Sequence, residues 1–339
     1  MNKWKYCTIN WMILHEIQAK EFDNLAKAEP NTSIFQSSHY ADYQLDKGYK
    51  PLFLEYDEDN GNCVALAMFL IKKEGLLGIK SNAYCPSGYL INFYDEEILR
   101  SFNDELIKYF KTKKINKIII EPNYSSINKY INDNLLKLNY TKVKDINRYE
   151  LDIETYENTI SNHGILIRIN KTNELNDKLL TIFNNDQDKL KLFNCLKPYT
   201  YLYYAYIDSY KSKEGLLNEK QEHQSFINEH SDDYKFNEQI LQANKQIEEI
   251  DAYLNSIEKL ENAYGNDPIL GLMCLSEYAS NYEILFEIGL KESEEFNIYS
   301  FISDEIVKQA IENKCNVSSF NKYKLNKEIN LLGTYTLKI

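Results

Sequence analysis

Residues 95–122, DEEILRSFNDELIKYFKTKKINKIIIEP, contain the pattern that decides the fold class. Between positions 95 and 113, apolar residues such as Ile98 and Phe102 recur at the spacing of a helix. The run of three isoleucines at 118–120 has the length and β-branched composition of a buried strand. A helix that leads directly into a strand indicates an α/β or α+β domain.

The rest of the first 145 residues continues this alternation. Positions 16–28 have a helical rhythm, and positions 52–56 and 63–72 are typical of strands. The turn sequence DEDNG at 57–61 joins the two strands into a hairpin. Because side chains alternate across a strand, we expect the apolar face of 63–72 to point inward.

A second unit begins near Ile146 and is interrupted by a long polar stretch. After that stretch the pattern predicts a strand at 283–289, an amphipathic helix at 303–313 and a last strand at 334–338. The chain therefore repeats its α/β pattern.

The polar stretch contains a coiled-coil seam. The seam positions step alternately by four and three and are apolar except at Glu261, namely Phe236, Ile240, Ala243, Ile247, Ile250, Leu254, Ile257, Glu261 and Tyr264. A weaker seam upstream has the same spacing, formed by Leu216, His223, Ile227, His230 and Tyr234. The sequence predicts an antiparallel helical hairpin over 213–262, in which the two histidines form polar layers.

Charge is distributed unevenly along the chain. The net charge of −12 argues against a protein coated in nucleic acid, because phosphate binding needs Lys and Arg. Positions 104–144 nevertheless contain nine Lys against four acids, and 313–339 contain five Lys against one acid. The hairpin at 213–262 has five Lys against twelve acids, so the acidity belongs mainly to that segment.

Cysteine usage and hydropathy restrict the cell compartment in which we expect the protein. The six cysteines form no C-x-x-C pair, so we expect no metal site and a reducing, cytoplasmic location. The longest apolar run, 64–71, is too short to span a bilayer, and the first residues lack the apolar core of a signal peptide.

No Q/R-x-x-G-x-G/A loop for an acyl-CoA pyrophosphate is present, so we expect no cofactor.

Several short motifs follow one another in an order that resembles the FemABX family of peptidoglycan cross-bridge aminoacyltransferases. These motifs are the opening IFQSSHYADY at 34–43, the turn YCPSGY at 84–89, the strand IIIEP at 118–122, AYID at 205–208 before the hairpin, and the end from Phe320 to Gly333. The resemblance spans nearly the whole chain.

The resemblance implies two tandem domains of acetyltransferase-like (GNAT) fold with an inserted antiparallel coiled-coil hairpin. The first domain would comprise 1–145 plus 317–339, and the second would comprise 146–316, interrupted by the hairpin at 213–262. It also implies an aminoacyltransferase that moves an amino acid from aminoacyl-tRNA to an amine on a peptidoglycan precursor stem peptide. An amine that attacks an activated ester needs positioning, a proton acceptor and oxyanion stabilisation.

Site residues are implied by position within these motifs. The resemblance points to Asn92 and Phe320 as catalytic positions, and to a substrate-binding group of Tyr40, Gln44, Tyr84, Ser87, Gly88, Lys322 and Lys324. We expect Gly88 to supply a positive φ in its turn. Three positions differ from the family pattern, since Gln44, Asn92 and Asn321 stand where it has Lys, Asp and Lys.

These replacements leave two classes of function open. The first is the aminoacyltransferase, or an N-acyltransferase acting on another cell-surface glycan precursor. The second is a Fem-like fold without transferase activity that acts as a binding or scaffolding protein. In either class the −7 charge of the hairpin predicts contact with a homodimer partner or a basic protein, whereas tRNA would contact the basic 104–144 surface. Peripheral contact with a membrane is also compatible with the sequence.

Overall fold

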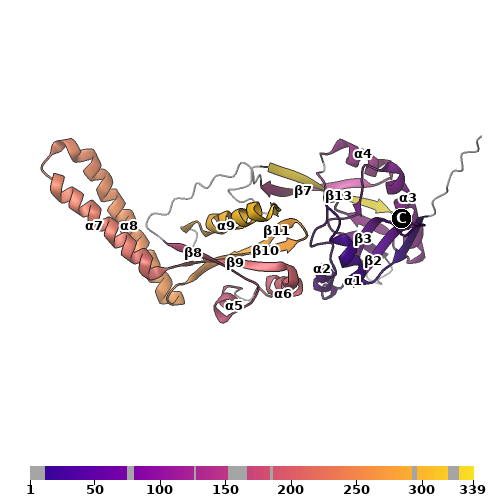
Figure 1. The fold of residues 1–339 in the computed structure, drawn as a ribbon, viewed down its shortest axis with the longest axis horizontal. Coiled ribbons are helices and arrows are strands. Elements are labelled where there is room, and N and C mark those ends of the chain that lie inside the picture. The colour runs from indigo at the N-terminus through magenta and orange to yellow at the C-terminus, as the bar shows by residue number, and fades with distance from the viewer. Residues whose placement is uncertain are drawn as a thin grey trace, which may run out of the picture.

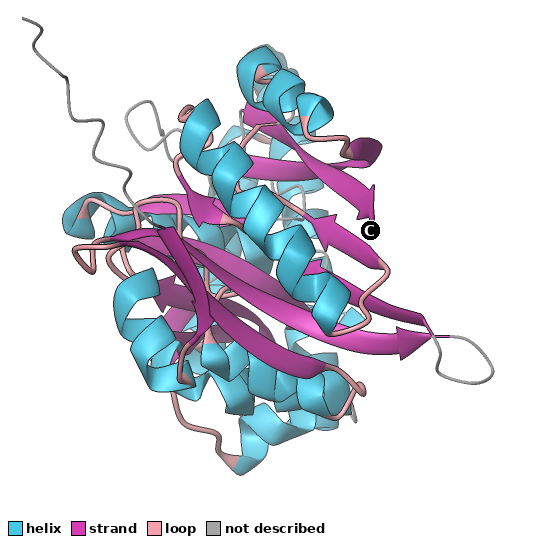
Figure 2. Cartoon of the chain, turned by 90° about the vertical axis from the view of Figure 1, so that its right-hand side faces the viewer, coloured by secondary structure: helices cyan, strands magenta, loops and turns pink. Residues whose placement is uncertain are grey.

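A computed structural model of the chain describes residues 12–74, 80–125, 127–151, 166–183, 186–291, 296–319 and 328–339. The described strands form one 13-stranded sheet, with helices on both of its faces (Figures 1 and 2). No described helix combines the length and the apolar character that crossing a bilayer requires.

The first half of the chain alternates helices with strands. Its elements are β1 (Met12–Glu16), α1 (Ala19–Ala26), α2 (Ser38–Leu45), β2 (Lys50–Glu58), β3 (Cys63–Glu74), β4 (Lys80–Cys85), β5 (Leu90–Ile91), α3 (Glu96–Thr112), β6 (Lys117–Ile120), α4 (Lys129–Lys137) and β7 (Thr141–Leu151). The α3–β6 pair confirms the helix and strand predicted over 95–122. Asp95 caps α3, because its Oδ1 accepts the backbone N–H groups of Glu97 and Ile98.

The second half repeats the alternation around the hairpin. Its elements are β8 (Ile167–Thr172), α5 (Asp177–Phe183), α6 (Gln187–Leu196), η1 (Lys197–Tyr199), β9 (Thr200–Ile207), α7 (Ser209–His230), η2 (Tyr234–Phe236), α8 (Asn237–Tyr264), β10 (Ile269–Tyr278), β11 (Asn281–Gly289), α9 (Ile298–Asn313), β12 (Asn316–Ser319) and β13 (Glu328–Lys338).

The sheet order is β1-β2-β3-β4-β6-β13-β7-β12-β11-β10-β9-β8, and β5 pairs with β3. Two neighbouring pairs are parallel: β4 with β6 in the first half, and β11 with β12 in the second. Strand β13 lies between β6 and β7, so the C-terminus returns to the N-terminal half of the sheet (Figure 1).

Strand β3 corrects the expectation of one inward face. All residues from Ala65 to Leu70 are buried. Ala65, Ala67 and Phe69 pack into the cluster that includes α3, whereas Leu66, Met68 and Leu70 pack into the cluster that includes α1 and α2. Because helices cover both faces of the sheet here, the strand has no solvent-facing side.

Two further clusters cover the faces of the sheet in the second half. One joins α9 and the base of the hairpin to strands β9 and β10, and the other joins α5 and α6 to the opposite face. Leu216, Ile257 and Leu260 belong to the first of these clusters, so the hairpin base is part of the core.

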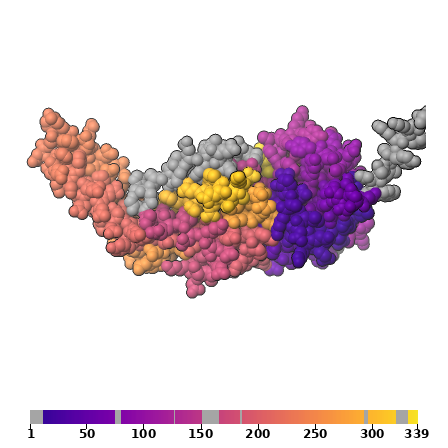
Figure 3. Space-filling model, in the orientation of Figure 1, coloured from indigo at the N-terminus to yellow at the C-terminus, as the bar shows by residue number. Residues whose placement is uncertain are grey.

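Helices α7 and α8 form the predicted hairpin, which projects from the body as an arm (Figures 1 and 3). Its seam buries Ala243, Ile250 and Ile257 as expected. Tyr234 and Tyr264, which we expected in the seam, are exposed, because η2 shifts the turn and Leu260 takes the buried place near the base.

Candidate functional site

The buried glutamine of the opening motif, Gln36, holds two separate segments together. Its Nε2 donates to the carbonyl of Pro86 at 2.5 Å and to that of Met68 at 3.3 Å. Its Oε1 accepts the backbone N–H of Met68 at 2.9 Å. The side chain is fully buried, so these bonds satisfy polar groups that water cannot reach. Gln36 therefore fixes the turn after β4 relative to β3.

The serine that follows sets the start of α2. Ser37 Oγ accepts the backbone N–H of Tyr40 at 3.2 Å and donates to the carbonyl of Ile34 at 2.6 Å. This N-cap fixes the helix from which Tyr40 and Gln44 extend, four positions apart and therefore on one face. The side chain of Gln44 hydrogen-bonds the phenol of Tyr40.

The turn after β4 differs in one respect from the prediction. Ser87, not Gly88, has the left-handed backbone conformation, with φ of 48°. Glycine is required at position 88 because a Cβ there would lie 2.4 Å from Cys85 Sγ and 3.1 Å from Gln36 Nε2. Ser87 and Gly88 are both buried, so this turn contributes backbone shape at the site.

A pocket of about 440 Å³ opens beside the parallel pair β4–β6. Its lining comprises Tyr49, Leu70, Lys72, Glu74, Asn82, Tyr84, Lys117, Ile119, Glu121, Val143, Lys144, Thr334 and Thr336. Tyr84 Oη donates to Glu121 Oε2 at 2.5 Å, and Thr334 Oγ1 donates to Glu121 Oε1 at 3.0 Å. The three residues come from β4, from the end of β6 and from β13, so the pocket forms only when β13 inserts into the sheet. We call this the Tyr84 pocket.

Burial determines the protonation of the two tyrosines. Burial, together with the charge and hydrogen bond of Glu121, raises the pKa of Tyr84 far above its ordinary value. Burial likewise raises the pKa of Tyr40. Both phenols are therefore neutral at physiological pH, and Tyr84 acts as a hydrogen-bond donor to Glu121.

Three lysines surround the opening of the pocket. Lys117 and Lys144 belong to the basic segment 104–144, and Lys72 lies with its Nζ 4.6 Å from the ring centroid of Tyr49. None of the three has a carboxylate within ion-pair distance among the described residues. Their charges are therefore available to an anionic ligand.

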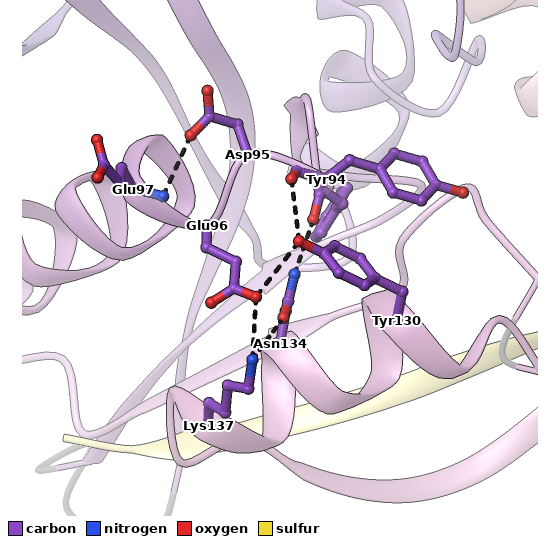
Figure 4. A network of polar contacts seen from close by, with 8 residues as sticks. Tyr94, Asp95, Glu96, Glu97, Tyr130, Asn134 and Lys137 are labelled. Carbon is purple, nitrogen blue, oxygen red and sulfur yellow. Dashed lines mark hydrogen bonds and ion pairs between the residues drawn. The ribbon is translucent and has the colours of Figure 1, made fainter.

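Asn92 lies at the start of a different polar network. Its Oδ1 accepts the backbone N–H of Tyr94 at 3.0 Å, and it does not line the Tyr84 pocket. Beyond this turn, Glu96 Oε1 accepts from Lys137 Nζ at 3.0 Å and from Tyr130 Oη at 3.3 Å, which ties α3 to α4 (Figure 4).

Three of the predicted site residues, Phe320, Lys322 and Lys324, lie outside the described residues. Of the predicted set, the structure brings together Tyr40, Gln44 and Tyr84.

Sequence reasoning missed Glu121, Lys72, Lys144 and Thr334 as site residues. Glu121 was visible as the acid of the IIIEP motif, but nothing local connected it with Tyr84. Thr334 reaches it from more than 200 positions away, and only strand pairing reveals that contact.

The sequence matches the profile of the FemAB family over residues 17–185, which include every described residue of the Tyr84 pocket except those on β13. The chain belongs to the FemAB family. The resemblance predicted from the motifs is thus confirmed. A search of curated proteins found no match.

One solved structure extends the likeness in fold to nearly the whole chain. The crystal structure of FemX aligns with a TM-score of 0.66 at 15% identity, covering 96% of this chain and 97% of FemX. A tandem GNAT protein from the clavulanic acid biosynthesis pathway aligns at 0.49 and 6% identity over 97% and 98% of the two chains. L-PGS from Bacillus licheniformis aligns at 0.48 and 8% identity over 96% and 92%. This FemAB protein has the FemX-like tandem GNAT fold, as predicted.

Proposed function

We propose that this FemAB-family protein is an aminoacyltransferase that moves an amino acid from aminoacyl-tRNA to an amine of a peptidoglycan precursor stem peptide. The observation that supports this most directly is the family match over the half of the chain that builds the Tyr84 pocket. The likeness to FemX over both chains supports the same fold for the remainder.

The pocket suits an anionic precursor at its rim. Lys72, Lys117 and Lys144 present three positive charges, against Glu74 and Glu121 in the same lining. A charge-assisted hydrogen bond contributes about 1.5 to 3 kcal/mol, roughly twice a neutral one. These lysines can therefore supply the attraction that Gln44 does not, and in our proposal Lys322 and Lys324 add to it from the closing segment.

Glu121 is proposed to orient the attacking amine and to accept its proton. In the transfer, the amine nitrogen forms a bond to the ester carbonyl, the ester C–O bond breaks, and the tRNA ribose leaves with a proton. Each Glu121 oxygen already accepts one hydrogen bond and keeps a lone pair for a substrate N–H. Because Tyr84 stays protonated, it holds the carboxylate in place and is not itself the base. Asn92 and Phe320 remain proposed catalytic positions.

We propose that the charged tRNA approaches along the basic segment 104–144, which supplies two of the pocket lysines. The acidic hairpin lies at the opposite end of the molecule (Figure 1). A tRNA at the pocket would then avoid the like charge of that arm.

The test is transfer of a labelled amino acid from charged tRNA to precursor by the purified protein. We expect Glu121→Gln to lower turnover by at least about a hundredfold, the lower range for loss of a proton-transfer group. We expect Tyr84→Phe to lower it less, because the carboxylate remains.

Lys72→Ala measures the rim charge. It should weaken binding of the precursor at low salt more than at high salt, since surface attraction is screened over about 8 Å at physiological ionic strength. Lys129→Ala, at an exposed lysine of the basic segment 104–144 outside the pocket, is the matched control. If the wild type binds precursor but transfers nothing from any charged tRNA, the scaffold alternative replaces the transferase.

A further inference from the structure

Away from the Tyr84 pocket, three metal-ligating side chains meet on one face of the β1–β2 ladder. His15 of β1 lies directly opposite Glu55 of β2, and Ile13 lies opposite Asp57. Glu55 and Asp57 are two positions apart on one strand, so both side chains point to the same face as His15.

The donor atoms of this group lie close together. His15 Nε2 is 3.7 Å from Glu55 Oε2, and His15 Nδ1 is 3.8 Å from Asp57 Oδ2. One donor atom from each residue can be chosen so that all lie within 4.8 Å of one another. Two ligand atoms that are each about 2.1 Å from a tetrahedral ion lie about 3.4 Å apart, so a small movement of the imidazole closes the site around one ring nitrogen.

One buried polar atom of this group has no partner among the described residues. Glu55 is 8% exposed, and both its carboxyl and that of Asp57 lie within 3.8 Å of the His15 ring nitrogens. Asp57 Oδ1 is buried and has no hydrogen-bond partner among the described residues. Two adjacent carboxyl groups with a buried oxygen lacking a donor are costly unless something positive lies between them. Cys63 lies opposite Asp57 on β3, and its thiol donates to the carbonyl of Ala65.

We propose that His15, Glu55 and Asp57 bind one divalent transition-metal ion, with Zn²⁺ preferred over Mn²⁺. An imidazole nitrogen favours Zn²⁺ over the harder ions that carboxylates alone would take, and affinities for such sites rise from Mn²⁺ to Zn²⁺. The ion would fasten the edge strand β1 to β2. Cysteine spacing led us to expect no metal site, and that criterion does not detect a site made of one histidine and two acids on paired strands.

The test is isothermal titration of the metal-free full-length protein with ZnCl₂, MnCl₂ and MgCl₂ separately. We expect one Zn²⁺ per chain, weaker binding of Mn²⁺ and the weakest binding of Mg²⁺. His15→Gln, Glu55→Gln and Asp57→Asn should each weaken Zn²⁺ binding by at least about tenfold, the lower range for residues that only support metal ligands. Zn²⁺ should also raise the melting temperature of the wild type and not that of these variants.

Two matched controls separate a specific site from casual binding. His39→Gln removes a histidine of α2, and Glu58→Gln removes the next acid along β2, which points to the opposite face. Both should bind Zn²⁺ as the wild type does, and circular dichroism checks that all variants fold. No measurable Zn²⁺ binding, equal loss in the control variants, or Mg²⁺ binding as tight as Zn²⁺ would each overturn the proposal. Because the measurement is metal binding, it is independent of transferase activity.

Discussion

Each of the two copies of the fold has a carboxylate beside its pair of parallel strands. The carboxylate of the first copy lines an open pocket, whereas that of the second copy is buried. In the first copy, Glu121 follows β6, which pairs with β4, and it lines an open pocket. In the second copy, Glu283 lies on β11, which pairs with β12, and it is 4% exposed. Its Oε2 accepts from Ser33 Oγ at 2.9 Å, and Ser33 comes from the N-terminal half.

The segment before α2 therefore packs against β11 of the second copy. Asn281 Nδ2 donates to the carbonyl of Thr32 at 3.1 Å, and Arg148 of β7 donates to Ser318 Oγ at 2.9 Å. One backbone pattern thus supports a ligand pocket in one copy and a packed junction in the other. The neighbouring strand differs between the two pairs, since β6 lies beside β13 and β12 lies beside β7.

The largest expected effect on the free energy of unfolding comes from removing Arg148, which lies in the packed junction beside Ser318 and Glu283. Arg148→Met removes a buried charge that bonds Ser318 and Asn123 and offsets the charge of Glu283. Each buried polar group left without its partner costs about 1 to 3 kcal/mol, so the free energy of unfolding in urea should fall by about 3 kcal/mol. Arg100→Met, at an exposed position of α3, should change it by less than about 0.5 kcal/mol. A fall below about 1 kcal/mol for Arg148→Met would mean that the junction does not depend on this charge.

A smaller effect on the free energy of unfolding is expected at Gly88, in the turn after β4 of the first copy. Gly88→Ala places a Cβ against Cys85 Sγ, and overpacking of this kind costs about 1 to 3 kcal/mol. The cost should decrease in a Cys85→Ala background, because the clashing sulfur is gone. Urea unfolding of the two single variants and the double variant measures this coupling. Equal costs of Gly88→Ala in both backgrounds would contradict the close-approach explanation.

The third expected effect is a pH dependence of the free energy of unfolding, which arises from the buried Glu283 of the second copy. Burial raises the pKa of Glu283 above 4.5, while Arg148 and the bond from Ser33 oppose this rise. The folded state then holds this proton more tightly than the unfolded chain. The resulting stabilisation is present below pH 4.5 and is lost as the pH rises through the raised pKa.

Glu283→Gln removes that titration. The unfolding free energy of the wild type minus that of the variant should therefore decrease as the pH is raised from about 4.5. Urea midpoints of both proteins between about pH 4.5 and 7.5 measure the difference. If the difference increases with pH over that range, the carboxylate is stabilised in its charged form and the predicted direction is wrong.

The smallest effect is expected at the tip of the α7–α8 hairpin, which belongs to the second copy, and it concerns binding of charged tRNA. Deleting 223–247 and joining the ends with a short Gly-rich turn keeps Leu216, Ile250 and Ile257 in the core. Binding of charged tRNA should not change, because the arm is acidic. Lys111→Glu and Lys129→Glu, in the basic segment, should weaken it. Loss of tRNA binding in the truncated protein, with its fold and oligomeric state intact, would show that the arm contacts RNA.

Periodicity predicted most of the elements because it reports which faces of a helix or strand are apolar. The hairpin and the α3–β6 pair were found in this way. The pattern failed at β3, where helices cover both faces, and at Tyr234, where a short 3-10 turn shifts the register. At β3 the deciding contacts come from helices distant in sequence, which a local window does not include, whereas at Tyr234 the cause is the local turn.

Sequence by itself determined the order of elements, the acidic arm, the basic segment and the family motifs, because these depend on residue type and spacing. Only the tertiary structure decided which polar groups meet. Thr334 reaches Glu121 because β13 inserts beside β6, and His15 reaches Glu55 because β1 pairs with β2. Hydrogen bonds and metal sites depend on distances of a few ångströms between side chains. Those distances are set by strand register across the sheet, which residue spacing along the chain does not specify.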